Sequence, residues 1–227
     1  MLKKEKSIKK CPYSRITKKV LGWLHLWLGL ISGIVVVISM LAASVFTWEE
    51  ELTNWWYADL VYHNQPASSY LSASALLEAV EKAYPAYKTN RLVVRSDINK
   101  NWTFRFRKRA ENQGWTYAST MEYDLLVFVN PFTGQVIGHI DKERDWISLA
   151  AVLHMSLLLN HAIGSQIVGA SALIMIILAL TGLYLWWPKN LKALRRKLTI
   201  KWKAKFKRVN WDVHSVGGFY TYIFILF

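Results

Sequence analysis

The stretch GWLHLWLGLISGIVVV, residues 22–37, lies inside a long apolar run that decides the fold class. The whole run, residues 20–46, has 27 residues and no charged side chain. At about 1.5 Å per residue, a helix of that length exceeds the hydrocarbon core of a bilayer, which is about 30 Å thick. The core of a cleaved signal peptide is shorter, roughly 7–15 residues. The run therefore predicts an uncleaved transmembrane helix.

Two further apolar runs follow this one. Residues 167–187 are 21 uncharged residues, which is long enough for a second spanning helix. Residues 213–227 number only 15, or about 22 Å of helix, which is too short to cross a bilayer. We expect a third transmembrane helix that the end of the sequence interrupts, and a re-entrant helix is the alternative.

The distribution of charge predicts the side of the membrane that each segment occupies. The sequence has 29 Lys plus Arg against 15 Asp plus Glu. Residues 1–19 hold eight of the basic residues and residues 188–210 hold ten, whereas residues 48–148 hold 11 basic and 13 acidic residues. Because cytoplasmic segments are enriched in Lys and Arg, the first two segments are predicted to be cytoplasmic and the central one external. The positive charge is thus a topology signal, and it does not indicate nucleic-acid binding.

The central segment has the pattern of a small α+β domain. Residues 72–84 have helical periodicity, with Ser72 or Ser74 as the N-cap. The stretches RLVVRS, NWTFRFRKR and EYDLLVFVNPFTGQVIGHI alternate apolar and polar residues, as strands do. Asn130 and Gly134 supply the turn within the last stretch. We therefore expect one helix packed on an antiparallel sheet.

The predicted fold class is an α-helical membrane protein with an inserted small α+β extracytoplasmic domain. A helix at 146–160 is expected to lie along the outer surface of the lipid bilayer, with a bend near Gly164. The predicted segments are a cytoplasmic basic tail (1–19), transmembrane helix 1 (20–47), the external domain (48–145), an interfacial helix (146–163), transmembrane helix 2 (164–187), a basic cytoplasmic loop (188–210) and the start of transmembrane helix 3 (211–227).

The sequence lacks the signatures of the common catalytic and nucleotide-binding sites. It contains no GxSxG, HExxH, P-loop or GxGxxG motif. Its single cysteine, Cys11, cannot form an internal disulfide or a CxxC redox pair. Any redox chemistry would therefore depend on a bound cofactor.

Histidines within the apolar segments are the candidate ligands of such a cofactor. His25 lies about 1.5 turns inside the first helix and His214 about one turn inside the third, both counted from the cytoplasmic end. Neutral imidazoles from two helices are the ligands that a membrane haem uses. The alternative is that both side chains lie among lipid headgroups. On the outer side, His154 and His161 are seven residues apart and would share one face of a continuous helix.

Several of these stretches resemble the PepSY-associated transmembrane proteins. The resemblance rests on LHLWLGLISG in the first helix, VNPFTGQVIG in the external domain, and LHMSLLL, TGLYLWWPK and WDVHSVGGFY in later segments. Some members of that family are ferric-siderophore reductases of the bacterial inner membrane, which carry two b-type haems between four main helices. The resemblance implies haem b held by His25 and His214, with His154 as one ligand of an outer haem. The present sequence lacks a fourth helix, and hence any ligand from it.

Two functions follow from this resemblance. The first is an inner-membrane haem protein that passes electrons from an unidentified donor to an external acceptor, such as ferric-siderophore iron. The second is a haem-free, membrane-anchored PepSY module that binds a peptide, a peptidase or a transporter. The run Arg105, Arg107, Lys108 and Arg109 would attract an anionic ferric chelate, or it is simply a solvated strand face.

Overall fold

The computed structural model describes residues 12–64 and 69–226, so Cys11 and most of the basic tail lie outside the described residues. The chain divides into two compact units, one formed by residues 1–34 and 170–227 and the other by residues 35–169. Each unit is described by itself.

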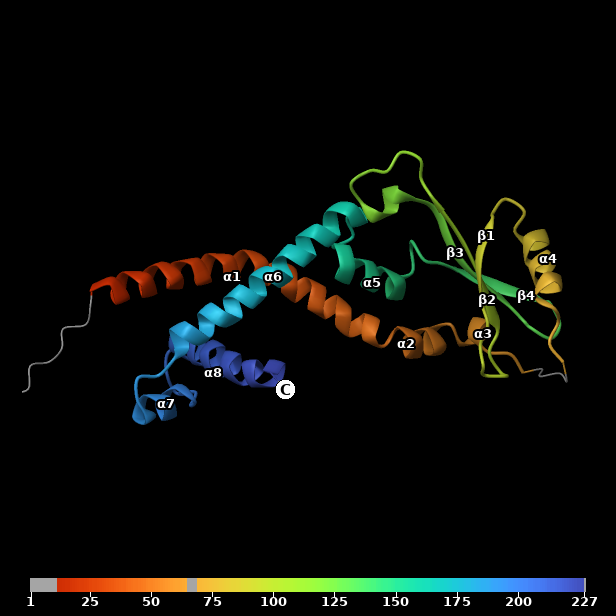
Figure 1. Ribbon diagram of the computed structural model, residues 1–227. Coiled ribbons are helices and arrows are strands. Elements are labelled where there is room, and N and C mark those ends of the chain that lie inside the picture. Colours follow the sequence, from red (N-terminus) through yellow and green to blue (C-terminus); the bar gives the residue numbers. More distant parts are fainter. Residues whose placement is uncertain (1–11, 65–68, 227) are drawn as a thin grey trace, which may run out of the picture. The chain divides into compact units, whose positions relative to one another are not determined.

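Long helices dominate the first unit (Figure 1). They are α1 (Pro12–Thr47) and α6 (His161–Trp186), which both continue into the second unit, together with α8 (Phe206–Leu226). Within α1 and α6, residues Ile16–Thr47 and His161–Trp186 are long and apolar enough to cross a membrane. The helices α1 and α8 both begin earlier than the predicted starts at residues 20 and 211, because the polar residues before each apolar run continue its helix.

The basic segment after α6 contains a short helix that the sequence analysis missed. This helix, α7 (Leu191–Lys197), begins after Asn190, whose side-chain oxygen accepts a hydrogen bond from the backbone nitrogen of Ala193 at 2.8 Å. Asn is a favoured N-cap residue because its side chain satisfies a free N–H group of the first turn. Leu191 and Leu194 lie at helical spacing, but seven residues are too few for this periodicity to indicate a helix.

An antiparallel sheet forms the centre of the second unit. The strands β1 (Thr89–Val93), β2 (Trp102–Arg109), β3 (Met121–Val129) and β4 (Val136–Asp141) follow in sequence order across the sheet. The predicted turn between β3 and β4 is confirmed, since the nitrogen of Gly134 donates to the oxygen of Asn130 at 2.9 Å and Gly134 has a φ of 72°. Glycine suits this turn because it adopts positive φ without steric cost.

Helices cover both faces of the sheet. One face is covered by α4 (Ala73–Ala83) (Figure 1). This helix packs Leu76 and Val80 against a buried cluster that includes Phe104 and Phe106. The predicted cap is confirmed at Ser72, whose hydroxyl accepts from the nitrogen of Ala75. On the other face, α3 (Ala58–Val61) follows α2 (Glu49–Trp56) and contributes to a second cluster formed by Val61, Phe128 and Ile140. The expectation of a single covering helix was incomplete, because α3 is too short to show helical periodicity.

The junction between α5 (Trp146–Ser156) and α6 corrects one prediction. The helix was expected to continue to residue 160 and to bend near Gly164, but it ends at Ser156 because Leu157 and Leu158 have φ of 56° and 58°. Two backbone hydrogen bonds hold this left-handed turn. The nitrogen of Tyr117 donates to the oxygen of Leu158 at 2.8 Å, and the nitrogen of Asn160 donates to the oxygen of Trp115 at 2.7 Å.

Gly164 has a different role from the predicted bend. A Cβ atom at this position would lie 2.0 Å from the backbone oxygen of Ser156, so only glycine allows this close approach of α6 to the end of α5. Leu157 and Leu158 themselves give no sequence signal of the break, because leucine rarely adopts positive φ.

Tyr57 joins the α2–α3 segment to α5 through a hydrogen bond. Its hydroxyl donates to Oδ1 of Asp145 at 2.8 Å, while Oδ2 of Asp145 caps α5 by accepting from the nitrogen and the hydroxyl of Ser148. Burial of the phenol, together with the hydrogen bond to Asp145, raises the pKa of Tyr57 from its ordinary value of 10.0 to about 12.

The raised pKa predicts a loss of stability at alkaline pH. Between pH 10 and pH 12 the unfolded chain releases the Tyr57 proton more readily than the folded chain, so the free energy of unfolding should fall as pH rises through this window. Chemical denaturation of wild type and of Tyr57→Phe over this pH range measures the effect, because other groups titrate in both proteins. An equal pH dependence in the two proteins would contradict the assignment.

Candidate histidine site and polar network

The first unit brings together two histidines that the sequence analysis selected. His25 comes from α1 and His214 from the third turn of α8. Their ring centroids lie 6.3 Å apart, and their ring planes are inclined at 67°. Two imidazoles that are 189 positions apart in sequence numbering (214 minus 25) therefore lie next to each other.

Thr181 of α6 fixes the orientation of the His25 ring. Its hydroxyl lies 3.0 Å from Nδ1 of His25 and donates to the backbone oxygen of Ile177 at 2.9 Å. Because a hydroxyl has only one proton, Thr181 accepts from Nδ1–H of His25. The neutral ring then has its lone pair on Nε2, the nitrogen that remains for a ligand.

Gly182 provides the space that the His25 ring occupies. A Cβ atom at Gly182 would lie 3.1 Å from Cε1 of His25, which is closer than ordinary van der Waals contact. By contrast, added Cβ atoms at Gly22, Gly217 and Gly218 would meet nothing within 4 Å among the described residues. The sequence analysis missed both Thr181 and Gly182, although they lie in the stretch TGLYLWWPK that carries part of the family resemblance.

Stacked aromatic rings hold α8 against α6. The rings of Trp186 and Phe219 have centroids 4.2 Å apart and an interplanar angle of 15°. Aromatic pairs of this kind contribute about 0.5–1.5 kcal/mol beyond the area that they bury. The contact lies five residues after His214 in α8, so it restrains the helix that carries this histidine.

The second unit contains the remaining histidines that the sequence analysis weighed. His154 and His161 lie on different helices because the left-handed turn separates α5 from α6, so the expectation of a shared helix face was wrong. Nδ1 of His154 lies 3.0 Å from the backbone oxygen of Ser39, which can only accept. The hydroxyl of Ser39 in turn donates to the oxygen of His154 at 2.8 Å. His154 therefore also carries its proton on Nδ1, whereas His161 is exposed.

Within residues 12–64 and 69–226, no group of three or more His, Cys, Asp or Glu side chains could hold a metal ion. A haem iron does not need such a group, because the macrocycle supplies four nitrogen ligands and the protein supplies only the axial ones. The two-histidine arrangement therefore differs from the sites that bind bare metal ions.

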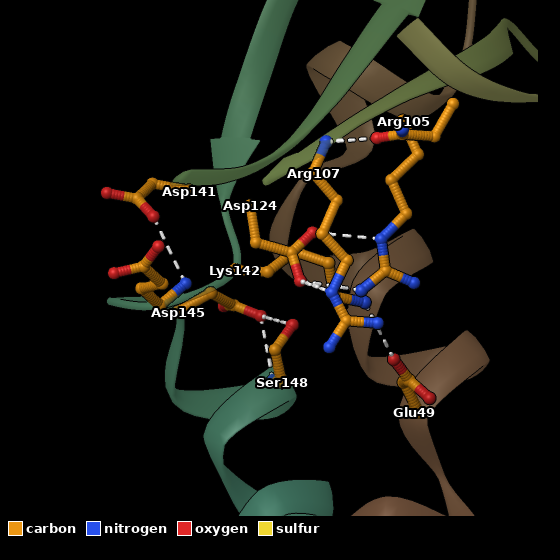
Figure 2. Close-up of polar contacts among 10 residues, drawn as sticks. Glu49, Arg105, Arg107, Asp124, Asp141, Lys142, Asp145 and Ser148 are labelled. Atoms are coloured by element: carbon orange, nitrogen blue, oxygen red, sulfur yellow. Dashed lines mark hydrogen bonds and ion pairs between the residues drawn. The ribbon is translucent and has the colours of Figure 1, made fainter. Parts of the chain in front are cut away.

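A buried carboxylate organises the polar face of the sheet (Figure 2). Asp124 of β3 is fully buried, and Arg105 of β2 donates to its two oxygens at 2.8 and 2.7 Å. Nε of Arg107 lies 3.3 Å from Oδ2 of the same carboxylate. The hydrogen bond to Asp124 raises the pKa of Arg105 despite the opposing effect of burial, so the guanidinium stays charged. Lys108, from the same basic run, pairs instead with Glu122.

A cavity of about 300 Å³ lies between α2 and this face of the sheet. It is lined in part by Asn101 and Thr103, which are both buried. Among the described residues, neither Oδ1 of Asn101 nor Oγ1 of Thr103 has a hydrogen-bond partner. Both are thus buried polar atoms without a hydrogen-bond partner in residues that line the cavity.

Two helices of spanning length and an inserted domain with a four-stranded sheet define the class of this protein: it is a membrane protein with a small α+β domain between its spanning helices. The chain belongs to the family described as the PepSY-associated TM region, whose model matches residues 22–227. The resemblance found in the sequence is thus confirmed at the level of the family. No curated protein matches the sequence.

Proposed function

We propose that this protein is a b-type haem protein of the bacterial inner membrane that passes electrons to an external acceptor. His25 and His214 would be the axial ligands of an inner haem, and His154 would be one ligand of an outer haem. The observation that carries the proposal is the placement of the His25 and His214 rings, with centroids 6.3 Å apart on two separate helices.

The spacing of these two rings suits axial ligation of one iron. A bond from a metal to an imidazole nitrogen is about 2.0 Å long, and the ring centre lies about 1 Å behind that nitrogen. Two imidazoles that hold one metal ion between their nitrogens would therefore have centroids about 6 Å apart. The observed spacing of 6.3 Å is close to this value, so His25 and His214 would be able to hold a haem iron between them.

The hydrogen bonds around the proposed ligands support the same function. Metal-binding histidines commonly donate their second N–H to a carbonyl, carboxylate or hydroxyl group, which fixes the tautomer. His25 does so to Thr181, and His154 does so to the backbone oxygen of Ser39. Each ring keeps an unprotonated Nε2, which would be the nitrogen that binds the metal.

A bound haem supplies one-electron redox chemistry, and the protein supplies binding, orientation and electrostatics. His25 and His214 would hold the inner haem from two helices, while Thr181 keeps one of the two rings in its orientation. The proposed electron acceptor is ferric iron held by a siderophore, which makes the protein a ferric reductase in this proposal. The α+β domain would lie on the side of that acceptor.

An optical spectrum of the full chain tests the proposal. Protein produced in haem-sufficient cells and purified in detergent should show b-type absorption that changes on reduction by dithionite. Electron paramagnetic resonance of the oxidised protein should show a low-spin signal from two imidazole ligands. A correctly inserted, folded chain that remains colourless after incubation with hemin would overturn the proposal and leave a haem-free anchored domain.

A further inference from the structure

Arginine side chains line a groove on the sheet, on the face opposite α4. The groove has a volume of about 270 Å³. Its lining consists of four arginines and one asparagine, and no carboxylate takes part: Asn90, Arg91, Arg105, Arg107 and Arg109. A lining of this composition offers hydrogen-bond donors and positive charge, which are the features that an anionic ligand requires.

The register of the strands concentrates these charges. Arg91 of β1 lies directly opposite Arg105 of β2, and Arg107 and Arg109 follow Arg105 at every second position of the same strand. Like charges directly opposite each other destabilise a sheet. Among residues 12–64 and 69–226, neither Arg91 nor Arg109 has an ion-pair or hydrogen-bond partner for its side chain.

Asp124 compensates only part of this charge. Its single negative charge faces Arg105 and Arg107, so the four arginines and the one carboxylate together keep a net charge of +3 (four minus one). The carboxylate also orients the guanidinium group of Arg105 by accepting two hydrogen bonds from it, whereas Arg107 makes only an ion pair with it (Figure 2). A guanidinium has five N–H donors, and the Asp124 contacts use only some of them. The groove thus combines two guanidinium groups that are paired with Asp124 and two uncompensated ones.

We propose that this groove binds a ligand with at least two negatively charged oxygen groups, either carboxylates or phosphates. Arginine recognises such groups through paired, charge-assisted hydrogen bonds. The ligand can be a free molecule or the headgroup of an anionic lipid, since both present the same chemistry. The inference rests on the α+β domain alone and does not depend on haem.

Binding of pyrophosphate to the full chain tests this site. In nanodiscs of zwitterionic lipid, titration calorimetry should detect pyrophosphate binding to the wild-type protein. The double variant Arg91→Gln/Arg109→Gln should bind at least about tenfold more weakly, because it loses two positive charges and their charge-assisted hydrogen bonds. Both side chains are exposed, so the variant should keep its fold, and circular dichroism checks this.

The matched control removes the same charge elsewhere in the domain. Lys82→Gln/Lys108→Gln should bind pyrophosphate as wild type does, because neither lysine lines the groove. Repeating the titrations in nanodiscs with phosphatidylglycerol separates the two ligand sources. If the lipid headgroup is the ligand, phosphatidylglycerol should weaken pyrophosphate binding to wild type, and the arginine variant should not show this competition. If a free anion is the ligand, pyrophosphate should bind wild type equally well in both kinds of nanodisc. No binding to wild type in zwitterionic nanodiscs, or equal weakening in both double variants, would overturn the proposal.

Discussion

Replacing His25 or His214 by alanine should remove the haem absorption of the inner site from the purified chain. Each substitution deletes one of the two imidazoles whose centroids lie 6.3 Å apart, and a b-type haem has no covalent attachment that would retain it. The haem-to-protein ratio should therefore fall in each variant by the same amount as in the double variant. Pyridine haemochrome analysis of the purified proteins measures this ratio.

Thr181→Val provides a more specific test of the same site. Valine keeps the shape of threonine but removes the hydroxyl that accepts from Nδ1 of His25. Loss of such a partner typically weakens metal binding about 10–100-fold without deleting a ligand. We expect the variant to bind hemin more weakly than wild type and to show an altered reduction potential.

His139→Ala is the matched control for these variants. His139 lies in β4 and pairs with the hydroxyl of Tyr84 at 2.9 Å, so its loss should leave the haem spectrum unchanged. Full haem content in both His25→Ala and His214→Ala would show that the ligands lie elsewhere. Equal loss in the His139 variant would indicate a general folding defect.

Replacing Arg105 by methionine should destabilise the α+β domain by about 3 kcal/mol. The substitution removes the two-pronged partner of Asp124, whose side chain has no exposed surface. Removing one member of a buried ion pair leaves the other charge uncompensated, and this usually costs about 3–5 kcal/mol. The lower end applies here because Arg107 still contacts the carboxylate and the Arg105 side chain is 27% exposed.

Hydrogen exchange of the β2 and β3 amides measures this effect locally in the full chain. Protection should fall strongly in Arg105→Met and recover in Arg105→Met/Asp124→Leu, because the second change removes the uncompensated charge. Lys108→Met is the control: its ion pair with Glu122 lies at the surface, and its loss should not change the exchange measurably. Unchanged protection in Arg105→Met would show that Asp124 does not depend on this partner.

Much of the fold could be predicted because it follows from local patterns. Long uncharged runs predicted α1 and α6, and the alternation of apolar and polar residues predicted β2, β3 and β4. The depths of His25 and His214 remain predictions, because they were counted from helix starts at residues 20 and 211, whereas α1 and α8 begin at Pro12 and Phe206. Helical rise fixes the depth of a residue along a helix but leaves open which way its side chain faces.

The remaining features depend on contacts between distant residues. Thr181 supports His25 only because α6 passes α1, and no spacing in the sequence relates them. The left-handed turn at Leu157 and Leu158 contains no glycine that would have predicted it. It depends instead on the hydrogen bonds that it makes with residues 115–117. The ion pair of Asp124 could have been predicted, because a carboxylate within the apolar strand EYDLLVFV needs a charged partner when it is buried.

The hydrogen bond from His25 to Thr181 also limits what this imidazole can do with protons. A histidine that relays protons must take one up at one nitrogen and release another from the second. At His25 the Nδ1 proton is directed to a hydroxyl whose own hydrogen points to the carbonyl of Ile177, so the acceptor cannot pass it onward. This imidazole is therefore unsuited to relay protons through Thr181.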